Sequence, residues 1–155
     1  MSYGTQIAGG AHAIGCELAA EVADSFGRVR LRVSGTSMAP AIRPGDLLSV
    51  EPADPAELSP GEIVVFTREG RLIAHRLVGK TESVGEGFLV TRGDRARRND
   101  SPVSGAELVG RVTGIERGGS PVNASAQLSL PEQMLCRVLR FSDRATYLYL
   151  RLAAL

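Results

Sequence analysis

The serine at position 37 has the surroundings that a nucleophile requires. Residues 34–40 form a turn rich in Ser, Gly and Thr directly after the β-branched run 29–33. A strand that ends in such a turn holds the Ser37 hydroxyl on fixed backbone, and Gly35 has the conformational freedom that lets N–H groups converge beside it. Met38 and Pro40 then restrict the backbone that follows Ser37. Because a serine-rich turn is more often only a turn, a partner group is needed before Ser37 is interpreted as a nucleophile.

Few residues can act as the base for Ser37, because almost all cations of the chain are arginines. There are 17 arginines, one lysine and two histidines. Arginine stays protonated and cannot accept the serine proton. His12 lies in a Gly/Ala-rich segment without predicted order, and Lys80 lies in a predicted polar turn. His75 lies inside a predicted strand, residues 72–78, and histidine exchanges its proton near neutral pH. His75 is therefore favoured among these three, although a strand histidine is more often only packed.

The elements that must position these groups are short strands. Between residues 29 and 122, β-rich runs are interrupted by Pro, Gly or Asp at intervals of roughly 8 to 15 residues. The runs are 29–33, 47–50, 63–66, 72–77, 88–91 and 108–115. This spacing predicts a mainly β domain, either an antiparallel sheet or a partly closed barrel, rather than a βαβ repeat. Residues 68–71 (Arg-Glu-Gly-Arg) predict a hairpin between two of the strands.

Helical patterns flank the β region. Residues 14–26 carry apolar side chains at helical spacing, and Gly27 follows as a stop. Residues 130–155 are also helical in pattern, with a break at 142–143 and an apolar stripe formed by Leu130, Met134, Leu135, Val138 and Leu139. We expect this stripe to pack on its own domain, with a partner groove or a membrane surface as the alternatives.

These patterns divide the chain into four parts. Residues 1–28 are expected to be an N-terminal segment with a short helix, and residues 29–117 the β domain. Residues 118–129 are small and polar and are interpreted as a linker. Residues 130–155 form a helical C-terminal extension.

The composition indicates one soluble domain. The chain has 155 residues, of which 43% are hydrophobic, and a formal net charge of +1, which gives no electrostatic case for a nucleic-acid partner. Cys16 and Cys136 lack metal-ligand spacing and are expected to be thiols in a reducing compartment. No stretch reaches the roughly 18 apolar residues of a spanning helix. The N-terminus lacks a signal-peptide pattern, so we expect a cytoplasmic protein, with peripheral membrane contact through residues 130–155 as an alternative.

Five separated segments occur in the order of a known family. They are SGTSMAP (34–40), RPGDLL (43–48), GEIVVF (61–66), HR (75–76), and TRGD (91–94) followed by ND (99–100). Together they resemble the conserved boxes of type I signal peptidases and their LexA-like relatives over residues 29–117. Many members use a serine–lysine dyad, whereas the endoplasmic-reticulum, archaeal and sporulation-type enzymes carry histidine before arginine, as His75-Arg76 does here. The resemblance therefore implies Ser37 as nucleophile and His75 as general base.

The resemblance also implies an acid and an oxyanion site. In the histidine-type relatives the acid follows the Gly-Asp box by six residues, which here selects Asp100, with Asp94 as second choice. Alternatively, both aspartates cap turns around the basic run between them. Some relatives place a serine where this chain has Gly35. The oxyanion would then be held by backbone N–H groups around Gly35, Thr36, Ser37 and Met38.

The predicted function is that of a serine endopeptidase that cleaves a peptide or precursor peptide through an acyl-enzyme, using Ser37, His75 and Asp100. No metal and no organic cofactor are implied. Two alternatives remain open at this point. The same fold could bind an extended peptide by strand addition without turnover, or it could belong to a regulatory protein that cleaves itself.

Overall fold

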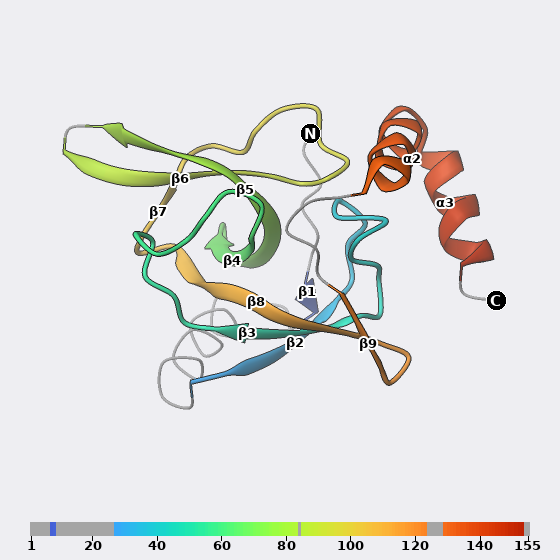
Figure 1. The fold of residues 1–155 in the computed structure, drawn as a ribbon, viewed down its shortest axis with the longest axis horizontal. Helices are drawn as coiled ribbons and strands as arrows, with labels where there is room; N and C mark the ends of the chain where they lie inside the picture. The colour runs from blue at the N-terminus through green and yellow to red at the C-terminus, as the bar shows by residue number, and fades with distance from the viewer. Residues whose placement is uncertain (1–6, 9–26, 84, 124–128, 154–155) are drawn as a thin grey trace.

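The computed structural model describes residues 7–8, 27–83, 85–123 and 129–153, which form one antiparallel sheet followed by two helices (Figure 1). The strands are β1 (Ile7–Ala8), β2 (Val29–Val33), β3 (Leu47–Glu51), β4 (Ile63–Arg68), β5 (Arg71–Ser83), β6 (Glu86–Arg92), β7 (Val103–Ser104), β8 (Leu108–Arg117) and β9 (Ser120–Val122). The helices are α2 (Leu130–Phe141) and α3 (Asp143–Leu152). The strand order is β1-β2-β3-β8-β4-β5-β6-β7, with β9 beside β8. The prediction of a mainly β, antiparallel fold is confirmed, in the form of an open sheet.

Strand β4 lies inside the sheet, between β8 and β5, and has apolar core on both of its faces. Ile63 and Val65 pack in one apolar cluster, whereas Val64 and Phe66 pack in a second. Successive strand residues point to opposite faces, so four consecutive buried residues require apolar partners on both sides. The neighbouring strand β5 is covered in the same way, which is why a histidine in it can be buried.

The β4–β5 hairpin is the one that the sequence predicts. Glu69 and Gly70 both have positive φ values, 51° and 69°, and Arg68 faces Arg71 across the turn. This is the two-residue turn that matches the twist of paired strands.

Strand β5 continues well beyond the predicted end and includes Lys80, so the prediction of a polar turn at Lys80 was wrong. Lys80 faces Leu89 of β6, and its Nζ donates to the carbonyl of Ala56 at 2.7 Å. Pairing with β6 supplies the backbone hydrogen bonds of this segment, and that tertiary contact outweighs its polar composition.

Three short strands lie where the sequence predicts none. β1 pairs with β2, and β7 pairs with Phe88 and Leu89 of β6. β9 forms inside the expected linker, where Val122 faces Ile115 of β8. The predicted N-terminal helix, His12 and Cys16 lie outside the described residues.

The two helices follow the predicted break, but the expected packing of the apolar stripe was wrong in part. Leu139 and Cys136 are buried, whereas Leu130, Met134 and Val138 are exposed. The reason is that α2 rests on polar contacts near the start of the β6–β7 segment, where Arg95 donates to the Leu139 carbonyl at 3.0 Å. Only the narrow face around Leu139 is covered.

In the described part of the chain no helix has the length and apolar character needed to cross a membrane.

Candidate active site

Ser37 lies in the turn between β2 and β3, and the backbone of that turn is tied on both sides. Within the turn the Ala39 N–H donates to the Thr36 carbonyl at 3.1 Å, and from outside the Arg95 N–H donates to the Ser37 carbonyl at 2.9 Å. The Ser37 Oγ lies 2.9 Å from Nε2 of His75. Only 6% of Ser37 is exposed. The hydroxyl is therefore fixed against one ring nitrogen of the histidine.

His75 is the central residue of the site, because it has a partner on each ring nitrogen. It lies on β5 and is 1% exposed. Its Nδ1 is 2.6 Å from Oδ2 of Asp100. The edge of its ring meets Phe66 of β4, with ring centroids 6.2 Å apart. With the proton on Nδ1 donated to Asp100, Nε2 is free to accept the Ser37 proton.

Asp100 lies in the segment between β6 and β7, and Thr91 is a second partner besides His75. Its Oδ2 accepts from the Thr91 hydroxyl at 2.7 Å, and its N–H donates to the Thr91 carbonyl at 2.8 Å. Thr91 is fully buried at the end of β6. The carboxylate therefore accepts a second hydrogen bond besides that of His75, which fixes its rotamer.

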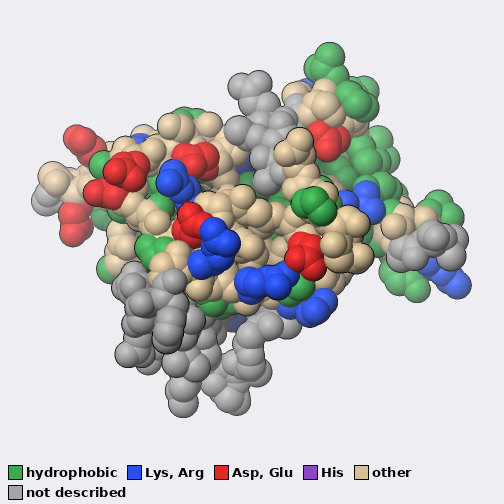
Figure 2. All heavy atoms as spheres, turned by 60° about the horizontal axis from the view of Figure 1, so that its bottom comes forward, with side chains coloured by type: hydrophobic (Ala, Val, Ile, Leu, Met, Phe, Trp, Pro, Cys, Tyr) green, Lys and Arg blue, Asp and Glu red, His purple; other side chains and the backbone are tan. Residues whose placement is uncertain are grey.

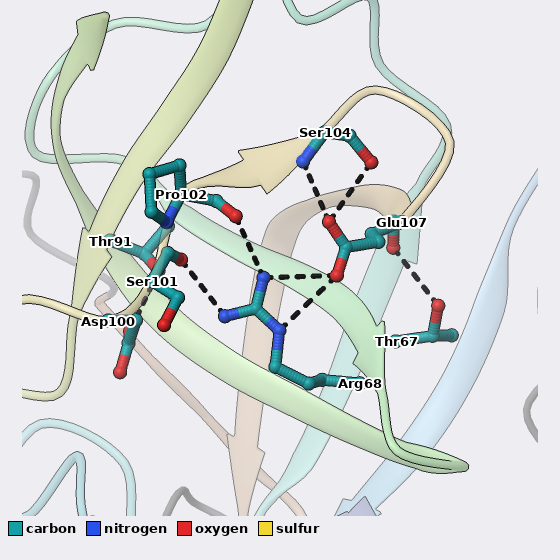
Figure 3. A network of polar contacts seen from close by, with 8 residues as sticks. All are labelled: Thr67, Arg68, Thr91, Asp100, Ser101, Pro102, Ser104 and Glu107. Atoms are coloured by element: carbon teal, nitrogen blue, oxygen red, sulfur yellow. Dashed lines mark hydrogen bonds and ion pairs between the residues drawn. The ribbon is translucent and has the colours of Figure 1, made fainter.

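Arg68, at the end of β4, anchors the chain directly after Asp100 (Figure 3). Its guanidinium donates to the carbonyls of Ser101 and Pro102 at 2.9 and 3.0 Å. It also pairs with Glu107 at 3.0 Å and stacks 5.3 Å above the Phe66 ring. Sequence reasoning assigned Arg68 only to a turn, because nothing local indicates that it reaches residues 101 and 102.

Glu107 completes this network. Although burial opposes it, hydrogen bonds from the Ser104 backbone and hydroxyl and from Arg68 lower the pKa of Glu107. The carboxylate accepts from the Ser104 N–H at 2.8 Å (Figure 3). A fixed carboxylate in turn fixes Arg68, so the position of the Asp100 segment depends on charged contacts rather than on apolar packing.

Asp94, the second choice for the acid, is bound elsewhere. Both of its oxygens accept from Arg76 at 2.9 Å, and this ion pair is largely buried. Arg76 also donates to the Gly61 carbonyl at 2.8 Å. The Asp94 N–H points to the Met38 sulfur at 3.4 Å. Asp94 thus connects β5 to the nucleophile turn, whereas Asp100 contacts the imidazole.

Gly93 is a residue whose role sequence reasoning missed, although it lies in one of the matching segments. A Cβ at this position would lie 2.9 Å from Nε2 of His75, 3.1 Å from the Ser37 carbonyl and 3.2 Å from the Ser37 Cβ. A side chain there would have to displace one of these groups. The local signal was the Gly-Asp pair itself, but only the fold shows that the backbone of Gly93 covers the contact between serine and histidine.

The other predicted site residues have different environments. Thr36 lines the groove described below, and its hydroxyl accepts from Arg95 at 3.1 Å. Gly35 is half-buried. Met38 is fully buried in the core, so its side chain supports the turn from below. Lys80 lies five residues from His75 on the same strand, about 16 Å away at the usual rise per residue.

Ser37 and His75 open onto a groove of about 960 Å³. Its lining includes Phe66, Asp100 and Arg140, together with residues 95–99. The described residues contain no cluster of His, Cys, Asp or Glu that could hold a metal ion. The arrangement can activate a serine hydroxyl toward a carbonyl carbon in the groove.

Cys136 lies close to the turn that carries Ser37. Its sulfur is 3.8 Å from the Ala39 carbonyl, and the thiol is free and buried, as predicted. Burial, assisted by the negative charge of Asp94, raises the pKa of Cys136 to about 11. The thiol therefore stays protonated and packs α2 against the turn.

Comparison with known families gives one match. The family described as Peptidase S24-like matches residues 13–91, just over half of the chain. The matched region includes Ser37 and His75 and ends before Gly93 and Asp100. Neither the curated proteins nor the solved structures contain a match to this chain. Membership of this family indicates a serine peptidase or a regulator that cleaves itself.

We predict that Asp94→Asn destabilises the protein more than Asp100→Asn does. The first change leaves the largely buried Arg76 without its counter-charge, which typically costs about 3 kcal/mol. An asparagine at position 100 can still accept from Thr91. Urea unfolding of both variants, with the exposed Glu57→Gln as control, measures this. A smaller loss for Asp94→Asn than for Asp100→Asn would contradict the structural role given to Asp94.

We also predict that Gly93→Ala slows modification of Ser37 by a fluorophosphonate, a reagent for activated serines, by about 100-fold or more. The new Cβ displaces His75 or the Ser37 backbone without removing a functional group. Gly87→Ala in β6 is the matched control, because a Cβ there meets nothing within 4 Å. Equal labelling rates for the two variants would show that the close approach of Gly93 is unimportant.

Proposed function

This chain belongs to the Peptidase S24-like family, and from that membership and the geometry of its site we propose that it is a serine endopeptidase acting on a peptide or precursor peptide. The observation that supports this best is the chain of contacts from Ser37 through His75 to Asp100, at 2.9 and 2.6 Å. Two buried or half-buried hydrogen bonds in series, on opposite nitrogens of one imidazole, match the geometry of a serine–histidine–acid triad.

In the proposed mechanism the Ser37 Oγ attacks the scissile carbonyl carbon while Nε2 of His75 takes the hydroxyl proton. Asp100 stabilises the imidazolium that forms and keeps the ring in orientation. The tetrahedral intermediate collapses to an acyl-enzyme as the imidazolium returns the proton to the leaving amine. Water then attacks the ester, again with His75 as base, and releases the acid and the free Ser37. Backbone N–H groups of the Gly35–Ser37 turn are the proposed donors to the oxyanion.

Within the wider superfamily we assign the chain to the histidine-type branch, which resembles the endoplasmic-reticulum, archaeal and sporulation-type signal peptidases. The support is that His75 contacts Ser37, whereas Lys80 binds the Ala56 carbonyl at 2.7 Å far along β5. For a lysine to act as the base, its Nζ would need to lie beside the Ser37 hydroxyl, where His75 lies in this structure.

Self-cleavage is the second candidate, because membership of the Peptidase S24-like family fits it as well. The two candidate functions differ in which peptide bond is cleaved and in how the cleavage rate depends on protein concentration. A self-cleaving chain loses its own peptide bond at a rate independent of protein concentration, and mass spectrometry of the incubated protein detects the fragments. An endopeptidase cleaves added peptides while its own chain stays intact. A peptide-binding module without turnover does neither.

We predict that Ser37→Ala and His75→Ala each lower peptide cleavage by at least about 1,000-fold, and that Asp100→Asn lowers it on the order of 1,000-fold or more. Lys80→Met is the control, because this side chain reaches only a distant carbonyl, and it should cleave at the wild-type rate. The assay measures kcat/KM on a fluorogenic peptide library together with fluorophosphonate labelling. Loss of activity in Lys80→Met with His75→Ala unaffected would overturn the mechanism.

A further inference from the structure

The groove beside Ser37 and His75 is lined by an unusual number of arginines for a chain whose charge is balanced overall. The cationic residues of the lining are Arg68, Arg71, Arg95, Arg97, Arg98 and Arg140, and the anionic ones are Glu69, Asp100 and Asp143. The formal net charge of the whole chain is only +1. Positive charge is therefore concentrated at the site where a substrate would lie.

Part of this charge is neutralised by internal contacts. Arg68 pairs with Glu107, Arg95 pairs with Asp143 at 3.0 Å, and Asp100 is bound to His75. These pairs hold the walls of the groove in place. They leave the lining with more arginines than carboxylates, since Glu107 lies outside it.

Three arginines of the groove remain exposed, and no ion pair joins them to any carboxylate of the described residues. Arg71 comes from the β4–β5 hairpin, and Arg97 and Arg98 come from the segment between β6 and β7. The Arg97 guanidinium lies 4.6 Å from the centre of the Phe141 ring. Stacking uses the face of the guanidinium and leaves its N–H groups, which lie in the plane, able to bind a carboxylate.

We propose that this groove selects peptides that carry Asp or Glu close to the scissile bond, with Arg97 and Arg98 as the residues that determine this preference. The inference rests on the proposed function, because it assumes that the peptide lies in the groove beside Ser37. An arginine binds a carboxylate through two parallel hydrogen bonds, and a partly enclosed groove screens the attraction less than open solvent does.

The experiment uses two readouts on one set of peptides. The peptides are random except for one fixed position, which is Glu, Gln or Lys, and they carry a fluorescent label. Their binding to Ser37→Ala protein is measured by anisotropy, and their cleavage by the wild-type protein is measured as kcat/KM. At the positions that the groove contacts, we expect Glu to be favoured over Lys by about 10-fold or more in both readouts, and about 0.5 M salt to reduce the preference.

Charge reversal identifies the residues. The double variant Arg97→Glu/Arg98→Glu should invert the preference toward Lys, whereas Arg151→Glu, an exposed arginine of α3 outside the groove, should leave it unchanged. Equal binding of Glu and Lys peptides, or an unchanged preference in the double variant, would overturn the proposal.

Fluorophosphonate labelling separates the hypothesis of peptidase activity from the hypothesis of specificity for acidic peptides. Labelled Ser37 without a Glu preference refutes only the specificity, whereas an unlabelled Ser37 with a Glu preference in binding refutes only the peptidase.

A second surface is independent of the active-site chemistry. Among the described residues eight large apolar side chains are exposed, and seven of them lie on α2 and α3: Leu130, Met134, Val138, Phe141, Tyr147, Leu148 and Leu152. Their exposed fractions lie between 57% and 77%. Figure 2 shows hydrophobic side chains gathered at the right-hand end of the molecule, where Figure 1 places the two helices. Such a concentration is typical of a docking surface.

The charges of these helices indicate what docks there. Arg137, Arg144 and Arg151 are exposed among the apolar residues. The two carboxylates of the helices are already bound, because Glu132 accepts from the Ser129 hydroxyl and Asp143 accepts from Arg95. The Ser129 hydroxyl and backbone lower the pKa of Glu132, which keeps it ionised and in place at the start of α2. An apolar helix face with exposed arginines is complementary to an anionic lipid surface.

We infer that α2 and α3 bind the surface of an anionic membrane without crossing it. In a co-sedimentation assay, vesicles that contain phosphatidylglycerol should retain the protein. Vesicles of phosphatidylcholine alone should retain less protein, by about 10-fold or more. Val138→Glu/Leu148→Glu should abolish retention. Val78→Glu is the control, because Val78 is the one exposed large apolar residue that the described part of the chain has outside the helices. Equal retention of both variants would overturn the inference. The inference would also be overturned if no vesicle retained the protein and analytical ultracentrifugation showed instead a dimer that the double variant does not form.

Discussion

The buried ion pair between Arg76 and Asp94 is the contact on which the site depends. Each partner is the chain neighbour of a residue in the active centre, because Arg76 follows His75 and Asp94 follows Gly93. The two hydrogen bonds of the pair, both 2.9 Å, therefore fix the segment that follows β6 against β5, next to Ser37. An isolated buried charge would be strongly unfavourable, so the pair forms as a unit or not at all. Its geometry sets how closely Gly93 covers the serine and histidine.

Charged networks, rather than additional apolar packing, hold the loops around the site. Arg68 and Glu107 fix the chain after Asp100, and Arg95 holds the nucleophile turn through Thr36. Loops carry many backbone carbonyls that the sheet does not satisfy, and a guanidinium can bind several of them at once. This explains why so many arginines of the chain line the groove. The use of arginine in these contacts also leaves positive charge facing the groove.

The C-terminal helices are part of the site rather than an appendage. The Leu139 carbonyl at the end of α2 accepts from Arg95, and Arg140 donates to the Asp94 carbonyl at 3.2 Å. Arg140 also lines the groove. Because α2 contacts the sheet domain mainly through such polar groups and through Cys136, its other face stays free.

The sequence by itself determined the features that depend on residue type and local period. The scarcity of lysine and histidine pointed to His75, the turn chemistry pointed to Ser37, and the β4–β5 hairpin follows from Glu69 and Gly70 at its tip. The spacing of the matching segments favoured Asp100 over Asp94, but only the tertiary structure shows that Asp100 contacts the imidazole and that Asp94 pairs with Arg76. The tertiary structure also placed the backbone of Gly93 over the serine–histidine contact and put Lys80 in a strand. It left three of the five residues of the apolar stripe exposed. These depend on strand register and on contacts between distant segments, and no periodicity along the chain encodes them.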